Sequence, residues 1–170
     1  MQDFSYLLPT EIIFGKDVEK TVGEQVKKHG GTSVLLVHYG DAFIKSTGLA
    51  DQIGKSLTDA GLKYVELDGI LPNPRADRVY AGIELARANQ VDFIVAIGGG
   101  STIDTAKAVG LGSCYDGDVA DLYYGRAVPK ASIPLGCVAT IPAAGSETST
   151  GSVITFGENK ICLLYTSRCV

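Results

Sequence analysis

The strongest constraint in this sequence is the stretch VDFIVAIGGGSTIDTAKAV, residues 91–109, in which an apolar run meets three consecutive glycines. The run that ends at Gly98 has the length and β-branched character of a buried strand, and the residues from Ser101 onward are typical of a helix. In a parallel α/β sheet, such a turn lies at the carboxyl end of a strand, where ligands bind. The turn Gly98, Gly99 and Gly100 is therefore predicted to be a ligand site.

Strand and helix patterns alternate along the rest of the chain. Strands are predicted at residues 11–14, 33–38, 63–68 and 93–98, and helices are predicted around residues 18–29, 49–60 and 77–89 and after the glycine turn. The strands are nearly continuous runs of Val, Ile and Leu, which indicates a parallel sheet that is covered on both faces. The predicted fold class is α/β with a parallel sheet.

Composition narrows the class of protein further. The 170 residues are 45% hydrophobic, enough for one ordinary core, and a net charge of −4 without a basic run predicts no nucleic-acid partner and no anionic membrane partner. We expect a cytoplasmic protein, because no segment resembles a signal peptide or a membrane span. The four cysteines are widely spaced and are predicted to be thiols, not disulfides: Cys114, Cys137, Cys162 and Cys169.

The glycine turn suits a phosphate group. Glycines allow positive φ and let a phosphate approach the backbone, while the free N–H groups and the dipole of the helix favour an anion. This chemistry predicts a pyrophosphate at Gly98, Gly99 and Gly100. Ser101 and Asp104 have the spacing of a capping box, so a purely structural strand-to-helix turn is the alternative. The spacing matches neither of the two commonest nucleotide-binding fingerprints.

A second group of polar residues lies in VATIPAAGSETSTGSVIT, residues 138–155, where another apolar run ends in small and hydroxyl side chains. Hydroxyls and backbone amides at a strand end can surround the ribose and phosphates of the same ligand. Each Ser or Thr taken alone is equally explained as a cap or turn residue. The pairing of the two turns is what favours a shared ligand.

Five segments carry a resemblance to a known family, and they occur in the order PTEIIFG, LPNPR, GGGSTIDTAK, YDGDVADLY and TIPAAGSETS. Together they resemble the iron-containing, or group III, alcohol dehydrogenases of the butanol dehydrogenase-like branch, from Phe4 to about Lys160. The resemblance implies a Rossmann-like, dehydroquinate synthase-like N-terminal half that binds NAD or NADP. It also implies a helical half, missing from this chain, in which an Asp and three His hold a divalent metal, Fe or Zn.

The same resemblance implies an activity and a set of cofactor-binding residues. The activity is the interconversion of alcohols with aldehydes or ketones by hydride transfer, in a parent protein that is a homodimer. Gly99, Gly100, Ser101 and Asp104 are implied to hold the pyrophosphate and the nicotinamide side. The rest of the cofactor is implied to be lined by Thr140, Ser149, Gly151 and Lys160.

The choice between NAD and NADP is predicted from Asp41. This residue follows the strand at 33–38, where an acidic side chain in dinucleotide folds accepts the ribose 2′-OH and repels a 2′-phosphate. The butanol dehydrogenase branch usually has a glycine-rich segment here, so Asp41 favours NAD. An ordinary turn aspartate is the alternative.

No catalytic residue and no metal ligand are assigned in this chain. His29 and His38 are isolated, and a metal site needs clustered ligands. Asp116, Asp118 and Asp121 lack the glycine and the terminal Glu of an EF-hand loop, so they are predicted to form a solvated turn and a helix cap.

The predicted domain is residues 1–160, and residues 161–170 are predicted to be a non-native tail, because CLLYTSRCV does not continue the family pattern. A short C-terminal strand is the alternative. The function predicted from the sequence is therefore the cofactor-binding part of an NAD(P)-dependent and metal-dependent alcohol dehydrogenase, inactive by itself. The alternative is a stand-alone module that binds a nucleotide or phosphate without catalysis.

Overall fold

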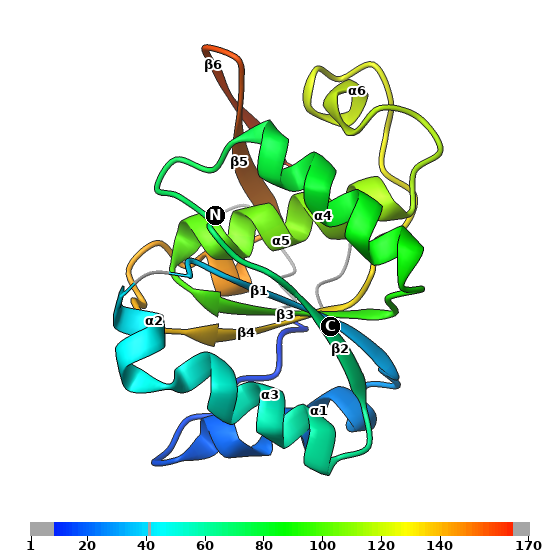
Figure 1. Cartoon of the computed structure of the whole chain (residues 1–170). Coiled ribbons are helices and arrows are strands. Elements are labelled where there is room, and N and C mark those ends of the chain that lie inside the picture. Colours follow the sequence, from blue (N-terminus) through cyan, green and yellow to red (C-terminus); the bar gives the residue numbers. More distant parts are fainter. Residues whose placement is uncertain (1–8, 41, 165–170) are drawn as a thin grey trace, which may run out of the picture.

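A computed structural model describes residues 9–40 and 42–164 of the chain. Its centre is a four-stranded parallel sheet in the order β2-β1-β3-β4 (Figure 1). The strands are β1 (Ser33–His38), β2 (Lys63–Leu67), β3 (Phe93–Gly98) and β4 (Leu135–Ala139). Register is continuous across the sheet, with Val34 opposite Phe93 and Gly98 opposite Ala139. The prediction of a parallel α/β sheet is confirmed.

Helices cover both faces of this sheet, as Figure 1 shows. One face carries the 3-10 helix η1 and the helices α1 and α3, and the other face carries α4 and α5. Their bounds are η1 (Val18–Thr21), α1 (Val22–Lys28), α3 (Leu49–Asp59), α4 (Ala76–Ala88) and α5 (Gly100–Ser113). Two shorter helices are α2 (Ala42–Thr47) and α6 (Val119–Tyr123). Among the residues that the structure describes, no helix has the length and apolar character to cross a bilayer.

The two cores follow from the alternation of side chains along the buried strands. In β1, Val34 and Leu36 face α1 and α3, whereas Leu35 and Val37 face α4 and α5; all four side chains are fully buried. Successive residues of a strand point to opposite faces, so a strand that is apolar at every position needs a layer of helices on each side. This is the physical reason for the three-layer arrangement.

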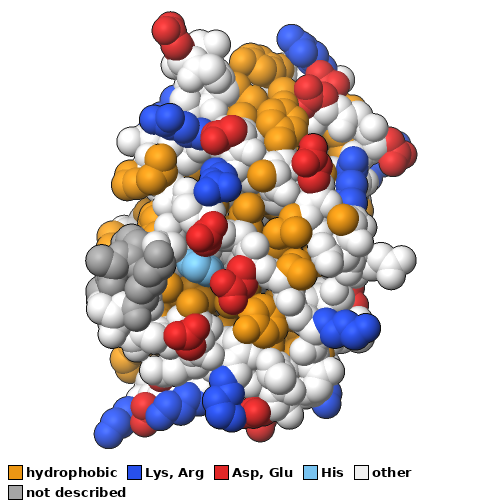
Figure 2. Space-filling view, viewed as in Figure 1, with side chains coloured by type: hydrophobic (Ala, Val, Ile, Leu, Met, Phe, Trp, Pro, Cys, Tyr) orange, Lys and Arg blue, Asp and Glu red, His pale blue; other side chains and the backbone are white. Residues whose placement is uncertain are grey.

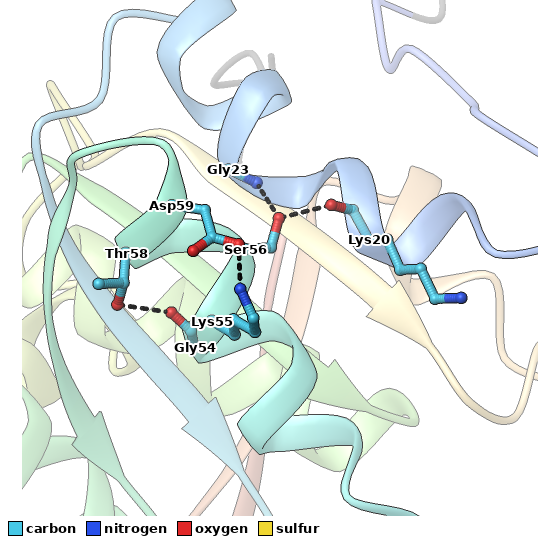
Figure 3. A network of polar contacts seen from close by, with 7 residues as sticks. All are labelled: Lys20, Gly23, Gly54, Lys55, Ser56, Thr58 and Asp59. Atoms are coloured by element: carbon cyan, nitrogen blue, oxygen red, sulfur yellow. Dashed lines mark hydrogen bonds and ion pairs between the residues drawn. The ribbon is translucent and has the colours of Figure 1, made fainter.

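Ser56 of α3 fastens the segment η1–α1 to α3 (Figure 3). The Ser56 hydroxyl donates to the carbonyl of Lys20 at 2.6 Å and accepts the N–H of Gly23 at 3.0 Å. A side chain at Gly23 would collide with the backbone of Ser56, so the two helices can approach this closely only through a glycine.

An antiparallel hairpin, β5 (Gly151–Phe156) and β6 (Asn159–Leu164), lies beside α5 outside the parallel sheet. Ile154 is fully buried and belongs to the same core as α4 and α5. Residues 161–164, which fall within the predicted tail, form most of β6, as the alternative of a C-terminal strand expects. The boundary at residue 160 stays a prediction, and residues 165–170 lie outside the described part.

The strand predicted at residues 11–14 is wrong, because these residues have no regular secondary structure. Ile12 is 68% exposed and Phe14 is 99% exposed. A run of β-prone residues becomes a strand only where it meets a hydrogen-bonding partner, and strand preference depends strongly on that context. Within residues 9–40 and 42–164, residues 11–14 pair with no other strand.

Candidate dinucleotide site

The glycine turn joins β3 to α5 at the carboxyl edge of the sheet. The chain leaves β1 toward β2 and leaves β3 toward β4, so the carboxyl ends of β1 and β3 border the point where the strand order reverses. Ligands of open α/β sheets bind at this topological switch point. Gly98 ends β3, Gly99 is the N-cap of α5, and Gly100 is its first residue. The structure therefore places the turn where the sequence predicted a ligand.

Gly98 is required by the fold. Its φ is +152°, in the range that favours glycine, and an added Cβ would lie 2.5 Å from Thr102 Oγ1 and 2.8 Å from a ring carbon of Tyr39. Both neighbours are in the interior of the turn, so a side chain at this position would displace them. Gly98 brings the end of β3 against the start of α5 and the end of β1.

Gly99 and Gly100 differ from Gly98, because their surroundings have room for a side chain. A Cβ on Gly99 would lie 3.6 Å from Tyr39 Oη, and a Cβ on Gly100 would lie 3.5 Å from the Cβ of Ala144, which are ordinary contact distances. The φ of Gly99 is −96°, which any residue adopts. No contact within the described chain therefore requires glycine at these two positions, as expected where a ligand approaches the backbone.

The N-terminus of α5 offers unused donors to such a ligand. The Gly99 carbonyl accepts the N–H groups of Thr102 and Ile103, at 3.1 and 3.2 Å, and no side chain caps the helix. The first N–H groups of a helix have no partner within it and carry its positive dipole end. Thr102 Oγ1 is fully buried and has no hydrogen-bond partner within the described residues. Open glycines, free N–H groups and an unpartnered hydroxyl fit the phosphates of a dinucleotide.

The predicted capping box of Ser101 and Asp104 is wrong. Asp104 faces the connection between β4 and β5, where its carboxylate accepts the hydroxyl of Ser146 at 2.6 Å and the N–H of Val153 at 3.0 Å. Helix initiation therefore does not explain Ser101 and Asp104, because Gly99 takes the N-cap position and the Asp104 carboxylate bonds elsewhere.

Lys107 was given no role by the sequence analysis, yet it holds the same connection. Its side chain is 2% exposed, and its ammonium donates to the carbonyls of Ser146, Ser149 and Gly151 at 2.6 to 2.8 Å. The available signal was a lone charge in the otherwise small and apolar run TAKAVGLG, three residues after Asp104. A lysine inside a buried helix face needs polar partners, and here the backbone supplies them.

The second predicted segment is joined to the glycine turn at its start and to the side of α5 at its end. Thr140, just after β4, donates its N–H to the carbonyl of Gly98 at 3.1 Å. Ser149 and Gly151 lie against α5 through their bonds to Lys107. Thr140, Ser149 and Gly151 thus belong to the connection that borders the glycine turn, with Ile141 and Ala144 as the residues nearest to Gly99 and Gly100.

Lys160 lies on the hairpin, not in the connection that borders the glycine turn. It lies on β6 opposite Thr155, and its ammonium donates to the Asn73 side chain at 2.8 Å in the loop after β2. The N–H of Thr155 also donates to the Pro74 carbonyl at 2.8 Å, so the hairpin and this loop are joined. The structure brings Lys160 to the loop after β2 and shows no bond from it to the glycine turn. Asp41 lies outside the described residues.

The end of β1 contributes Tyr39 and His38. Tyr39 lies beside Gly98 and Gly99. His38 is buried; its Nδ1 accepts the N–H of Gly40 at 3.0 Å and its Nε2 lies 3.4 Å from Glu66. In the view of Figure 2, a histidine is visible at the surface with acidic side chains around it. Among the described residues, no group of three or more His, Cys, Asp or Glu side chains could hold a metal ion.

Tyr80 and Asp118, outside the glycine turn, form a hydrogen-bonded pair that shifts the pKa of both groups. Burial, and then the hydrogen bond to Asp118, raise the pKa of Tyr80 to about 12. That bond from Tyr80 is also the main reason why the pKa of Asp118 is lowered, and the Asp118 carboxylate caps α6 through the Ala120 N–H at 2.9 Å. The predicted helix cap is confirmed.

Comparison with known proteins identifies the family of this chain. The model of the family "Iron-containing alcohol dehydrogenase" matches residues 9–170. The chain belongs to this family. It is 44% identical over 160 residues to the probable NADH-dependent butanol dehydrogenase 1 of Bacillus subtilis, covering 94% of this chain and 41% of that protein. It is 35% identical over 157 residues to the NADPH-dependent aldehyde reductase YqhD of Escherichia coli, covering 91% and 39%.

A solved structure agrees with the sequence comparison. The crystal structure of NADH-dependent butanol dehydrogenase A from Thermotoga maritima superposes with a TM-score of 0.93 at 35% identity, covering 98% of this chain and 42% of that one. The chain thus spans about two fifths of the length of these relatives. The Rossmann-like α/β fold expected from the resemblance is confirmed, and the family is one of oxidoreductases.

Proposed function

We propose that this chain is the dinucleotide-binding part of an enzyme that transfers hydride between a nicotinamide cofactor and an alcohol or aldehyde. The observation that carries the proposal is the pair of open glycines, Gly99 and Gly100, at the N-terminus of a 14-residue helix on the switch point of the sheet. The relatives support it, since one is described as NADH-dependent and another as NADPH-dependent.

The cofactor is proposed to bind between the turn from β3 to α5 and the connection from β4 to β5. The pyrophosphate accepts the free N–H groups at Gly100 and Ser101, and the unpartnered hydroxyl of Thr102 lies behind them. Thr140, Ser149 and Gly151 line the remainder of the dinucleotide. Asp104 contributes indirectly, because both of its carboxylate oxygens bond to the connection between β4 and β5.

The reaction itself needs more than the described residues provide. The family name implies iron, and the side chains described here contain no group of three that fits a metal ion. We therefore derive no metal-dependent step for this chain. The proposal is that metal ligands come from the part of the relatives that this chain does not span, and that residues 1–170 alone bind cofactor without turnover.

Titration with NADH, followed by the fluorescence of the reduced nicotinamide, tests the proposal. Gly99→Val is the decisive variant, because its backbone conformation and surroundings accept a side chain while a pyrophosphate would meet it. We expect the folded variant, checked by circular dichroism, to bind NADH at least tenfold more weakly, which is about 1.4 kcal/mol. Unchanged affinity would place the ligand elsewhere.

The same titration with NADPH tests the role of Asp41. We propose a preference for NADH, because a carboxylate after β1 accepts a ribose 2′-OH and repels a 2′-phosphate. NADPH binding as tight as NADH binding would make Asp41 an ordinary turn residue.

A further inference from the structure

Lys107 and its surroundings resemble a cation site more than a packing contact. Its Nζ lies 2.6 Å from the carbonyl oxygen of Ser146, 2.8 Å from that of Ser149 and 2.8 Å from that of Gly151. We call these three oxygens the carbonyl cage. The hydroxyls of Ser146 and Ser149 lie at 3.1 and 3.4 Å. An ammonium has three N–H donors, and the carbonyl cage can accept all of them.

Packing alone does not account for a lysine at this position. The side chain is almost completely buried, and its neighbours Ala106, Ala108 and Val109 on α5 are buried as well. A charged group is costly in such surroundings unless it is fully hydrogen-bonded, and an apolar side chain of similar length would fill the space without that cost. The bonds of Lys107 go to backbone oxygens of one short segment, so their effect is to fix the course of that segment.

The segment that Lys107 fixes has little regular secondary structure of its own. Between Ala139 and Gly151 the regular structure is the three-residue 3-10 helix η2 (Ser146–Thr148). Asp104, one turn before Lys107 on α5, binds the Ser146 hydroxyl and the Val153 N–H. The two charged side chains of α5 therefore hold residues 146–153, the part of this connection that leads into β5.

Lys107 acts on the site through residues 146–151, to which its ammonium is bonded. It lies seven residues after Gly100, which is about 10 Å along a helix axis. Its influence on a ligand at the glycine turn must pass through the segment that it holds.

We infer that Lys107 is a positioning residue of the dinucleotide site, whose ammonium serves as an internal cation that shapes residues 146–151 for contact with the cofactor. This inference rests on the proposed function. Without the ammonium, three carbonyl dipoles point at one another, and the segment moves apart unless another cation enters. Cofactor affinity then falls although the sheet and α5 remain folded.

The experiment uses the whole 170-residue chain and measures NADH dissociation constants by fluorescence, with folding checked by circular dichroism. Lys107→Met removes the ammonium donors and keeps an unbranched side chain as far as the Cε position. Leu57→Ala is the matched control, since Leu57 is a fully buried residue of α3, packed in the core on the opposite face of the sheet, and its truncation lowers stability away from the site. We expect at least tenfold weaker NADH binding for Lys107→Met and a change of less than twofold for Leu57→Ala.

Chemical rescue separates positioning from general support of the fold. Lys107→Ala lacks the atoms of a propylammonium ion, so propylammonium chloride should restore at least half of the lost affinity. Neutral 1-propanol at the same concentration should restore none, because it carries no charge for the carbonyl cage. Sodium chloride at equal ionic strength controls for screening.

The outcomes are distinct. If the wild-type chain does not bind NADH, the proposed function fails. If the wild type binds and Lys107→Met binds equally well, or if Leu57→Ala loses affinity to the same extent, the inference on Lys107 is overturned while the proposed function stands. If neither Lys107 variant folds even with propylammonium, Lys107 is a requirement of the fold, and the positioning role is overturned as well.

Discussion

Two connections at the carboxyl edge of the sheet are proposed to line the same cofactor, and they are built in different ways. The turn from β3 to α5 is short, and it keeps its shape through glycine packing and the backbone bonds of Gly99. The connection from β4 to β5 is longer and is held by Lys107 and Asp104 of α5. One helix therefore provides the proposed phosphate site at its N-terminus and supports the second connection along its side.

The largest effect on stability is expected for a substitution of Gly98, in the turn from β3 to α5. Gly98→Ala should lower the free energy of unfolding by about 2–3 kcal/mol, because φ is +152° and the added Cβ meets Thr102 and Tyr39. Gly99→Ala is the matched control and should change stability by less than about 0.5 kcal/mol. Urea unfolding measures both. Equal losses at the two glycines would remove the distinction between a packing glycine and a ligand-facing glycine.

A smaller loss of stability, confined to the connection from β4 to β5, is expected for Asp104→Ala. This variant leaves the Val153 N–H and the Ser146 hydroxyl without their acceptor and should cost about 1–2 kcal/mol. Hydrogen exchange should become faster for amides 146–153 and stay as in the wild type for amides 98–103. Faster exchange in both stretches would show that the two connections are one unit.

The smallest effect is expected at the opposite edge of the sheet, where Asp92 accepts the N–H groups of Thr32 and Ser33 and the hydroxyl of Thr32. Burial is the largest single influence on the pKa of Asp92 and raises it, but these hydrogen bonds together outweigh burial and lower the pKa. A lowered pKa contributes stability that is present above the ordinary carboxyl pKa of about 3.9 and is lost as the pH falls through the folded value.

Asp92→Asn should therefore lower stability by about 1 kcal/mol at pH 7, and the difference from the wild type should shrink below about pH 4. Urea unfolding at pH 7 and pH 3 measures this difference. NADH affinity at pH 7 should be the same in both proteins. A loss of affinity would show that the cofactor site responds to stability anywhere in the sheet.

The sequence alone was sufficient for the parallel sheet and for the place of the first turn. The centres of strands such as β1 and β3 are continuous apolar runs, and this pattern is local, so it can be read without knowing what packs on it. The glycine triplet predicted the position of the turn from β3 to α5 for the same reason. Residues 11–14 were less predictable, because a strand depends on a pairing partner: they have the composition of a strand and lack its pairing.

Only the tertiary structure decided what the polar residues of α5 do. Spacing gave a capping box as the alternative role of Asp104, because a carboxylate three residues after a serine can bond to its own helix. In the folded chain, Asp104 and Lys107 reach Ser146, Ser149 and Val153, more than 35 residues away in the sequence. Local pattern determines which elements form, whereas the partner of a buried charge is set by which segments the folded sheet brings together.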